Sequence, residues 1–395
     1  MVCVFSLLLA CGVILVREKS NLTMNAHSPL LDPVEVGFRL FPNRIVMAPL
    51  TRMRAHMPGN IPWALNEEYY RQRSSAGLII SEGTPVSVTG HGYYGTPGIH
   101  TAEQVEGWKG VTRAVHNASG HIFLQLWHVG RLSHTDLQPG GAAPLAPSAI
   151  AAEGSAHTKE GPKPWSLPRA LQIDEISQIV ADFARGAAMA KEAGFDGVEI
   201  HGANGYLLEQ FLSDRINLRD DIYGGSVENR ARFFLDVVAA VTAVWGSEYV
   251  GVRISPSNTY GTVEHSDRYG TYAHLIGKLN AFHLAYLHIV EPRVAGNIDI
   301  DPLHDLGCSR FRPLVTGSTK LISAGGYTRE SGERAIAEGH TDLVAYGRSF
   351  IANPDLVERF REGAPLNPYD RSTFYGGTEK GYTDYPTLER SLQSV

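Results

Sequence analysis

Cysteine is scarce in this chain of 395 residues. Cys3 and Cys11 lie at the very start, and Cys308 is the one cysteine in the remainder of the sequence. A single thiol cannot form an internal disulfide there, and it cannot supply the several ligands of an iron–sulfur cluster. This scarcity indicates a reducing compartment, and we expect the protein to be cytoplasmic.

Basic charge is also low. The net charge is -6, charged residues make up 19% of the chain, and no stripe of Lys and Arg is present. The sequence therefore argues against a nucleic-acid partner. The hydrophobic content of 43% is typical of a globular protein, and the length is sufficient for a large core.

A long apolar run occurs at residues 2–16, VCVFSLLLACGVILV, and nothing after Met24 resembles a targeting or membrane-spanning segment. The run is shorter than the roughly 20 apolar residues that cross a bilayer, and it lacks the basic start of a signal peptide. We expect residues 1–23 to be an extension outside the fold and residues 24–395 to form the folded domain. A membrane anchor is the alternative, because LLAC before Gly12 has some likeness to a lipoprotein cleavage site.

Short apolar segments rich in Val, Ile and Leu alternate with longer segments of helical periodicity. The short ones are flanked by Gly or Pro, which is typical of parallel strands buried on both faces. Strands are predicted at residues 44–50, 77–83, 121–127, 197–202, 250–256, 286–292, 321–326 and 343–349. Helices are predicted at residues 66–75, 102–116, 174–193, 226–244, 269–280, 329–338 and 354–362. Residues 301–313 predict a poor helix, because they carry two prolines and a glycine.

Eight strands, each followed by a helical segment, indicate a single-domain α/β fold of the (β/α)8 TIM barrel type. A doubly wound fold would carry G-x-G-x-x-G after its first strand, and the first strand here runs into APLTRMRA instead. Residues 29–43 are expected to form a hairpin that closes the N-terminal end of the barrel. The long loop at residues 130–168, after the third strand, is expected to be a functional lid, because long loops in compact domains are usually functional.

Polar residues gather at the C-terminal ends of the predicted strands, where barrel enzymes build their active sites. The candidates are Thr51, Glu82, Gly83, Gln125, His128, His201, Asn204, Tyr206, Arg253, Glu291, Arg293, Gly325, Gly326, Gly347 and Arg348. The segments ISAGGY and AYGRSF end the last two strands, where barrels commonly bind phosphate. Their glycines let backbone N–H groups approach an anion, and Arg348 can neutralise it. The alternative is that these glycines only turn strand into helix.

Arg253 and Gln125 lie at neighbouring strand ends of this predicted site. The cation of Arg253 must be compensated in a mostly apolar barrel mouth. It either forms a structural ion pair with Glu199 or Glu82, or it stabilises a bound anionic group. Gln125 offers both a donor and an acceptor, and it is either a ligand-binding residue or a satisfied polar residue of the barrel.

The segment HGANGYLLEQFL, at residues 201–212, places three polar groups just past the fourth strand. His201 and Asn204 can each donate a hydrogen bond to one oxygen that gains negative charge, and Tyr206 can transfer a proton. A structural role is the alternative for an isolated histidine, but the nearby amide and phenol favour function. The tail LLEQFL is expected only to pack this loop onto the barrel.

A metal site is a further interpretation of the strand ends. His128, His201, Glu199, His288 and Asp196 are potential ligands. A hydrolytic barrel usually carries a close His-x-His pair at its first strand, and none is present there. Because the spacing supports no ligand set, we expect no metal, and a metal-dependent hydrolase is the rival function.

The strand-end segments together resemble the old yellow enzyme family of FMN-dependent ene-reductases. The resemblance extends from about Pro33 to Leu388 in the family's order, although residues 256–272 and 293–320 match poorly. The matching stretches are RIVMAPLTRMRA, GLIISEGTPVS, GYYGTPGIHTAEQVEGWK, QLWHVGR, AGFDGVEIHGANGYLLEQFLSDRINLRDDIYGGSVENRARF, GVRISP, LISAGGYT, AYGRSFIANPDLVERF and GYTDYPTL.

The resemblance implies a tight, non-covalent FMN and assigns roles to residues of this chain. The implied cofactor-binding residues are Thr51, Gly83, Gln125, Arg253, Gly325, Gly326, Gly347 and Arg348. The implied catalytic residues are Tyr206, His201 and Asn204, and the implied substrate-binding residues are His201, Asn204, Tyr93, Trp127 and Tyr382. Arg253 would stabilise negative charge near N1 of the reduced flavin, and Gly83 would add space beside the flavin.

The resemblance also implies a ping-pong reaction. NADPH or NADH would reduce the flavin and leave, and an α,β-unsaturated carbonyl or nitro compound would then take its place. His201 and Asn204 would polarise that substrate, flavin N5 would pass hydride to Cβ, and Tyr206 would protonate Cα on the opposite face. We expect small-molecule substrates, no nucleic-acid or membrane partner, and a monomer or homodimer. A flavin-binding protein without turnover is the third candidate.

Overall fold

The computed structural model describes residues 27–389, except residue 297 and residues 303–304. The apolar segment that the sequence predicts to be an extension, residues 1–23, lies outside the described residues. Across the part of the chain that is described, no helix combines the length and the apolar character needed to cross a membrane.

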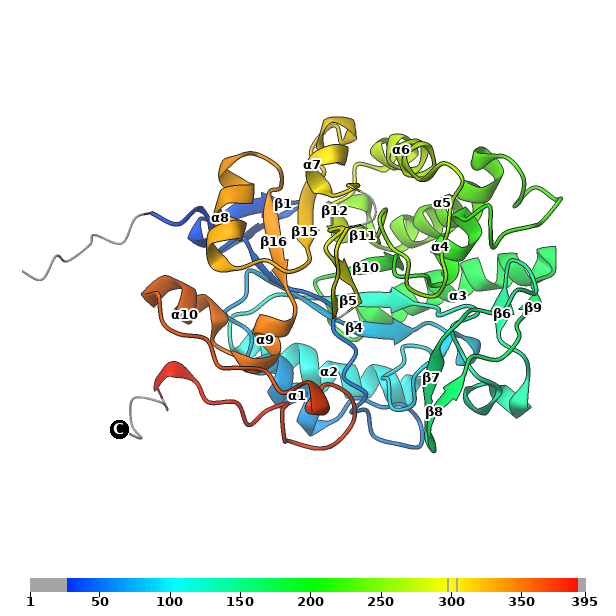
Figure 1. Cartoon of the computed structure of the whole chain (residues 1–395). Coiled ribbons are helices and arrows are strands. Elements are labelled where there is room, and N and C mark those ends of the chain that lie inside the picture. Colours follow the sequence, from blue (N-terminus) through cyan, green and yellow to red (C-terminus); the bar gives the residue numbers. More distant parts are fainter. Residues whose placement is uncertain (1–26, 297, 303–304, 390–395) are drawn as a thin grey trace, which may run out of the picture.

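Eight parallel strands close into a barrel (Figure 1). In order around the barrel they are β3 (Ile45–Met47), β4 (Leu78–Pro85), β5 (Ile122–Trp127), β10 (Gly197–Gly202), β11 (Val250–Ile254), β12 (Tyr286–Val290), β15 (Lys320–Ala324) and β16 (Leu343–Tyr346). Each strand coincides with a predicted one, and almost every residue in them is buried, which explains their continuous apolar sequences. The predicted TIM barrel is confirmed.

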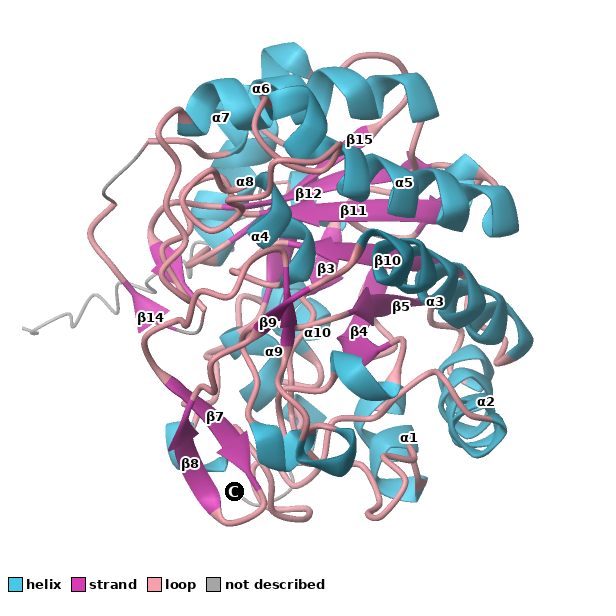
Figure 2. Ribbon diagram, turned by 90° about the vertical axis from the view of Figure 1, so that its right-hand side faces the viewer, coloured by secondary structure: helices cyan, strands magenta, loops and turns pink. Residues whose placement is uncertain are grey.

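Helices surround the barrel and cover the outer face of its strands (Figure 2). They are α1 (Ala64–Arg71), α2 (Ala102–Asn117), α3 (Ile173–Glu192), α4 (Leu207–Leu212), α5 (Val227–Trp245), α6 (Arg268–Leu279), α7 (Cys308–Phe311), α8 (Arg329–Ala337), α9 (Arg348–Ala352) and α10 (Leu356–Glu362). The predicted helices are confirmed, and the poor one is reduced to the single turn of α7. The short helices α4 and α9 were not predicted, and both begin directly behind candidate site residues.

The N-terminal hairpin joins β1 (Val34–Val36) to β2 (Arg39–Phe41) in antiparallel pairing. Phe41 is fully buried in one cluster with side chains of the barrel strands. Arg39 forms an ion pair of 2.9 Å with Asp196, which directly precedes β10. The hairpin therefore closes the N-terminal end of the barrel, as predicted, and leaves the C-terminal end for the site.

The long loop after β5 folds back over the C-terminal end of the barrel. It contains β6 (Leu145–Ala146) paired with β9 (Arg169–Ala170), and a hairpin of β7 (Ser155–Thr158) and β8 (Gly161–Pro164) that projects from the barrel in Figures 1 and 2. His157 of this hairpin stacks on Tyr93, with ring centroids 5.5 Å apart. The loop thereby reaches the rim of the candidate site.

Candidate active site

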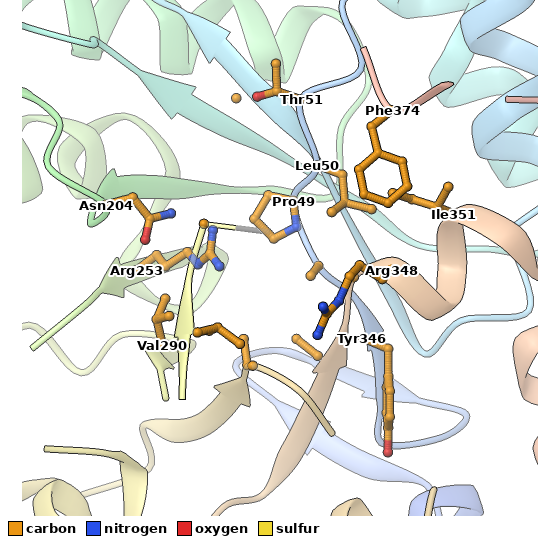
Figure 3. Close-up of a pocket in the computed structure, with 18 of the residues that line it drawn as sticks. Pro49, Leu50, Thr51, Asn204, Arg253, Val290, Tyr346, Arg348, Ile351 and Phe374 are labelled. Carbon is orange, nitrogen blue, oxygen red and sulfur yellow. The ribbon is translucent and has the colours of Figure 1, made fainter. Parts of the chain in front are cut away.

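A cavity of about 470 Å³ lies at the C-terminal ends of the barrel strands. It gathers all but one of the residues to which the family resemblance assigns a role, namely Thr51, Gly83, Tyr93, Gln125, Trp127, His201, Asn204, Tyr206, Arg253, Gly325, Gly326, Gly347 and Arg348. The other strand-end candidates, Glu82, His128, Glu291 and Arg293, do not line it. Figure 3 shows Arg253 and Arg348 pointing from opposite sides toward the space between them. Side chains that are far apart in the sequence thus face one cavity.

Tyr382 is the exception, and its predicted place in the substrate pocket is wrong. Its ring is fully buried and stacks on Tyr69 of α1, with centroids 4.0 Å apart. The guanidinium groups of Arg52 and Arg54 lie over its face, so it supports the loop after β3 from behind. The C-terminal segment instead contributes Phe374 and Tyr375 to the cavity lining.

Three aromatic rings form one wall of the cavity. Trp127 packs between Tyr93, at a centroid distance of 5.5 Å, and Tyr206, at 4.8 Å. The hydroxyl groups of Tyr93 and Tyr206 are 3.0 Å apart, and a third phenol, Tyr260, lies 3.2 Å from that of Tyr93. Tyr260 is not predicted from the sequence, because it belongs to a segment that matches the family pattern poorly.

The polar loop after β10 presents its groups to this wall. His201 and Tyr206 are almost fully buried, and Asn204 adopts a left-handed backbone with a φ of 55°. Burial, with Arg253 and His288 nearby, lowers the pKa of His201 well below its ordinary value, so the imidazole is neutral at pH 7. Burial also raises the pKa of the Tyr206 hydroxyl well above its ordinary value, so this phenol keeps its proton.

A fully buried carboxylate, Glu199, lies behind the cavity lining and contacts Gln125. It accepts a hydrogen bond of 2.7 Å from Nε2 of Gln125, which leaves the amide oxygen of Gln125 for other partners. Its second oxygen lies 2.8 Å from Nδ1 of His288. Burial opposes ionisation of Glu199, but His288, Arg253 and Gln125 together hold its pKa below the ordinary value. Glu199 therefore fixes the orientation of Gln125 and places a negative charge near Arg253.

Arg253 belongs to neither ion pair that the sequence left open. Among the described residues no carboxylate lies within ion-pair distance of its guanidinium group, and its Nε is buried without a hydrogen-bond partner. Glu199 acts on it only at longer range. Glu82 lies elsewhere, where it accepts a hydrogen bond from the backbone of Arg52. A buried cation with an unsatisfied donor that lines a cavity is suited to an anionic ligand.

The opposite end of the cavity carries the glycine-rich turns. Gly326 has a φ of 62°, in the left-handed region that favours glycine. Arg348 forms two hydrogen bonds to the carboxylate of Asp299, one of them 2.6 Å long. Asp299 lies in the small hairpin of β13 (Val294–Ala295) and β14 (Ile298–Asp299), which follows β12. A carboxylate at this predicted anion site is not predicted from the sequence.

The structure gives a different reason for a glycine at position 83 from the expected one, which was space beside the flavin. A Cβ atom at this position would lie 2.7 Å from Cε3 of Trp127, inside van der Waals distance. The glycine therefore lets the indole pack against β4, and the space that it provides is occupied by Trp127.

The potential metal ligands do not gather around one point. Within residues 27–389, apart from the three positions not described, no three His, Cys, Asp or Glu side chains are close enough to hold a metal ion. His288 pairs with Glu199, and His128 lies 3.3 Å from the hydroxyl of Thr89. The geometry offers no preformed metal site in this part of the chain.

Many known proteins are similar to this chain. Residues 29–367 match the model of the NADH:flavin oxidoreductase / NADH oxidase family. The chain is 46% identical to 12-oxophytodienoate reductase 1 of Oryza sativa subsp. japonica, over 95% of this chain and 97% of that protein. It is 44% identical to 12-oxophytodienoate reductase 2 of Arabidopsis thaliana, over 94% and 99% of the two chains.

Solved structures agree with this match. Morphinone reductase superposes with a TM-score of 0.87 at 47% identity, covering 93% of this chain and 99% of its own. Another structure of morphinone reductase is a complex with tetrahydroNAD. An old yellow enzyme homologue from Zymomonas mobilis gives a TM-score of 0.86 at 42% identity, over 91% and 99% of the two chains.

Proposed function

The chain belongs to the NADH:flavin oxidoreductase / NADH oxidase family and is a flavin oxidoreductase that reduces C=C bonds; we propose that its substrates are activated alkenes, in particular α,β-unsaturated carbonyl or nitro compounds. Family membership confirms the resemblance to the old yellow enzymes. One observation carries the proposal: His201, Asn204 and Tyr206 line the same cavity as Thr51 and Arg253.

FMN is the cofactor that the family implies, and the residues present fit it. The cavity volume of about 470 Å³ lies in the range of small-ligand pockets. Thr51, Gln125 and Arg253 would hold the pyrimidine edge, and the buried Nε of Arg253, which has no partner, could donate to it. Gly326, Gly347 and Arg348 would hold the phosphate with Gly325, at the end where barrels commonly bind it. When bound, FMN supplies the atom that transfers hydride.

His201 and Asn204 act on the substrate oxygen. The backbone N–H of Ala203 donates to Nδ1 of His201 over 3.4 Å, so the single proton of the neutral ring is on Nε2. That N–H and the side-chain amide of Asn204 are two donors for one oxygen. Donors that are held in place before reaction stabilise the negative charge that builds on a carbonyl or nitro oxygen.

Tyr206 supplies the proton to Cα. Its raised pKa keeps the hydroxyl protonated at neutral pH, as a general acid requires. The hydroxyl of Tyr93, 3.0 Å away, offers a partner through which the lost proton can be replaced. A nicotinamide nucleotide, NADPH or NADH, would use the same cavity before the alkene does, which gives a ping-pong order.

The test uses the purified, flavin-loaded enzyme. We expect a flavin absorption band, and we expect 2-cyclohexenone to reoxidise the reduced protein under anaerobic conditions. A flavin that stays reduced with the enone but is oxidised by oxygen would contradict the proposal and leave a binding protein without turnover. A colourless protein that a chelator inactivates would point to the rival hydrolase.

A further inference from the structure

The short helix α4, which follows the catalytic loop, contains a buried carboxylate that the proposed reaction does not use. Glu209 is fully buried behind the loop of residues 201–206 and takes no part in the cavity lining. Its neighbours in the sequence LLEQFL are apolar except for Gln210, which is also fully buried. An ionisable group at such a position needs a compensating set of partners.

Four donors from three separate segments surround this carboxylate. The backbone N–H of Gly205 donates over 2.5 Å, and the hydroxyl of Ser255, just after β11, donates over 3.0 Å. The amide of Asn258 donates over 3.2 Å, and the hydroxyl of Tyr272 in α6 donates as well. Glu209 therefore ties the loop after β10 to the loop after β11 and to α6.

The same network reaches the backbone of the catalytic amide. The N–H of Asn204 donates to the hydroxyl oxygen of Ser255 over 2.7 Å, and Ser255 in turn donates to Glu209. Two consecutive backbone amides, those of Asn204 and Gly205, are thus satisfied by Glu209 directly or through one hydroxyl. Both residues have a positive φ, of 55° and 79°. Glycine adopts such a φ freely, but for Asn204 this conformation needs support from its surroundings.

We propose that Glu209 is a positioning residue, which acts through Ser255 to hold the Asn204–Gly205 turn and so aims the side-chain amide of Asn204 at the substrate oxygen. This inference rests on the proposed function, because it assigns Glu209 to the same oxygen-binding loop. Gln210 assists from the other side, where its amide donates to the backbone carbonyl of Gly205 over 2.7 Å.

A carboxylate suits this place better than an amide. Its two oxygens are both acceptors, and every group that contacts them is a donor in the structure. Glutamine at position 209 would turn an NH₂ group toward one of these donors and leave a polar contact unmade. The loop would keep its chain path, but the turn at Asn204 would be held less firmly.

The experiment titrates flavin-loaded enzyme with p-chlorophenol at pH 8 and follows the long-wavelength charge-transfer band. Ser255→Ala removes the link between Asn204 and Glu209, and Glu209→Gln removes the acceptor. The matched control is Ser213→Ala, because Ser213 is equally buried, ends α4 and donates to Glu264 without contacting the turn. Retained FMN and the thermal midpoint are measured for each variant.

We expect phenol affinity to fall about tenfold in Glu209→Gln and about fivefold in Ser255→Ala, as the loss of charge-assisted hydrogen bonds implies. FMN retention should be unchanged, and Ser213→Ala should bind phenol within about twofold of wild type. Should Ser255→Ala and Glu209→Gln lose thermal stability but bind phenol like Ser213→Ala, Glu209 is only structural and the inference is wrong. If Glu209→Gln does not fold, the phenol affinity of Ser255→Ala alone tests the inference.

The two proposals fail in different ways. A wild-type enzyme that binds no phenol and does not reduce 2-cyclohexenone contradicts the proposed function and, with it, the role of Glu209. A wild-type enzyme that does both, while the two variants match the control, contradicts the role of Glu209 alone.

Discussion

The two ends of the cavity are built by opposite means. At the end formed by residues 201–206 the groups are buried and uncharged, and the chain's own hydrogen bonds hold them from behind. At the end near Arg348 the groups are charged, and the carboxylate of Asp299 has 62% of its side chain exposed to solvent. Buried neutral groups keep their positions, whereas an exposed ion pair is weak and can be exchanged for another anion.

The difference indicates that the two ends of the cavity suit different tasks. Hydride transfer requires a substrate oxygen to be placed within a fraction of an ångström. The end formed by residues 201–206, which we call the preformed end, therefore suits the chemistry. Anchoring a phosphate requires charge more than exact placement. The charged end near Arg348 therefore suits cofactor retention. Mutations at the two ends should therefore affect different measurements.

The largest effect is expected for Tyr206→Phe, which breaks the preformed end. Enone-dependent reoxidation should slow by roughly 10²-fold or more, because the general acid is lost. Reduction by NADPH or NADH and FMN content should be preserved. Stopped-flow measurement of the two half-reactions separates them, with Tyr223→Phe as the control, because Tyr223 is a buried phenol that donates to Asp236 and lies outside the cavity lining. Wild-type reoxidation in Tyr206→Phe would refute the assignment.

The next largest effect is expected for Arg348→Ala, at the charged end. Loss of a charge-assisted contact to phosphate should weaken FMN binding by about 10- to 100-fold. The fraction of enzyme that still holds FMN should reduce enones at close to the normal rate. Fluorescence titration of the apoprotein with FMN measures this, and Arg329→Ala, which removes an arginine paired with Glu333 on α8, is the control. Equal FMN affinity in both variants would remove Arg348 from the phosphate site.

A smaller effect is expected when the pH is lowered, because Glu209 supports the preformed end from behind. Burial raises the pKa of Glu209 to about 7, against the hydrogen bonds from Tyr272, Gly205 and Ser255. As the pH falls through this value the carboxylate takes up a proton and loses acceptor capacity. The advantage of wild type over Glu209→Gln in phenol affinity should therefore shrink from about tenfold at pH 8 to about twofold at pH 6.

The other ionisable groups near Glu209 do not change charge in this range. The pKa of Tyr272 is raised well above its ordinary value, and that of His265, which packs on Tyr272, is lowered to about 3. Because the phenol itself titrates equally in both assays, the ratio of affinities isolates Glu209, and a ratio that does not vary with pH would contradict this prediction.

The smallest effect is expected for Asp299→Asn, which has the opposite sign to Arg348→Ala. Asp299 occupies the guanidinium that is expected to bind phosphate, so its neutralisation should strengthen FMN binding by about two- to threefold. Glu333→Gln, which removes the carboxylate of another arginine pair, should leave FMN affinity unchanged. Weaker FMN binding in Asp299→Asn would show that Asp299 supports the site and does not compete for it.

Local sequence was a reliable guide to the barrel and to the strand ends. Parallel strands buried on both faces leave an apolar signature of a few residues, and the residue after each strand end must face the same rim. The positions of Arg253 and His201, opposite each other on β11 and β10, follow from that rule. The hairpin at residues 29–43 was also predictable, because it is local in the chain.

The prediction failed where contacts join distant segments. Tyr382 was placed in the cavity by its motif, but the packing of the C-terminal segment on Arg52 and Tyr69 turns it away and brings in Tyr375. The sequence predicts only a packing role for LLEQFL, whereas in the structure Glu209 also accepts hydrogen bonds from Gly205 and Ser255. The signal for this is a Glu at a buried helical position, where the charge must be compensated.

By itself the sequence determined the barrel, the family and the set of polar residues at the cavity rim, because strand periodicity and short motifs are local properties of the chain. Only the tertiary structure decided that Asp299 faces Arg348, that Tyr375 replaces Tyr382 in the lining, and that Glu209 lies behind the Asn204–Gly205 turn. Each of these depends on how loops from different strands pack against one another, and hydrogen bonds between segments 46 or 49 residues apart leave no pattern in a single sequence.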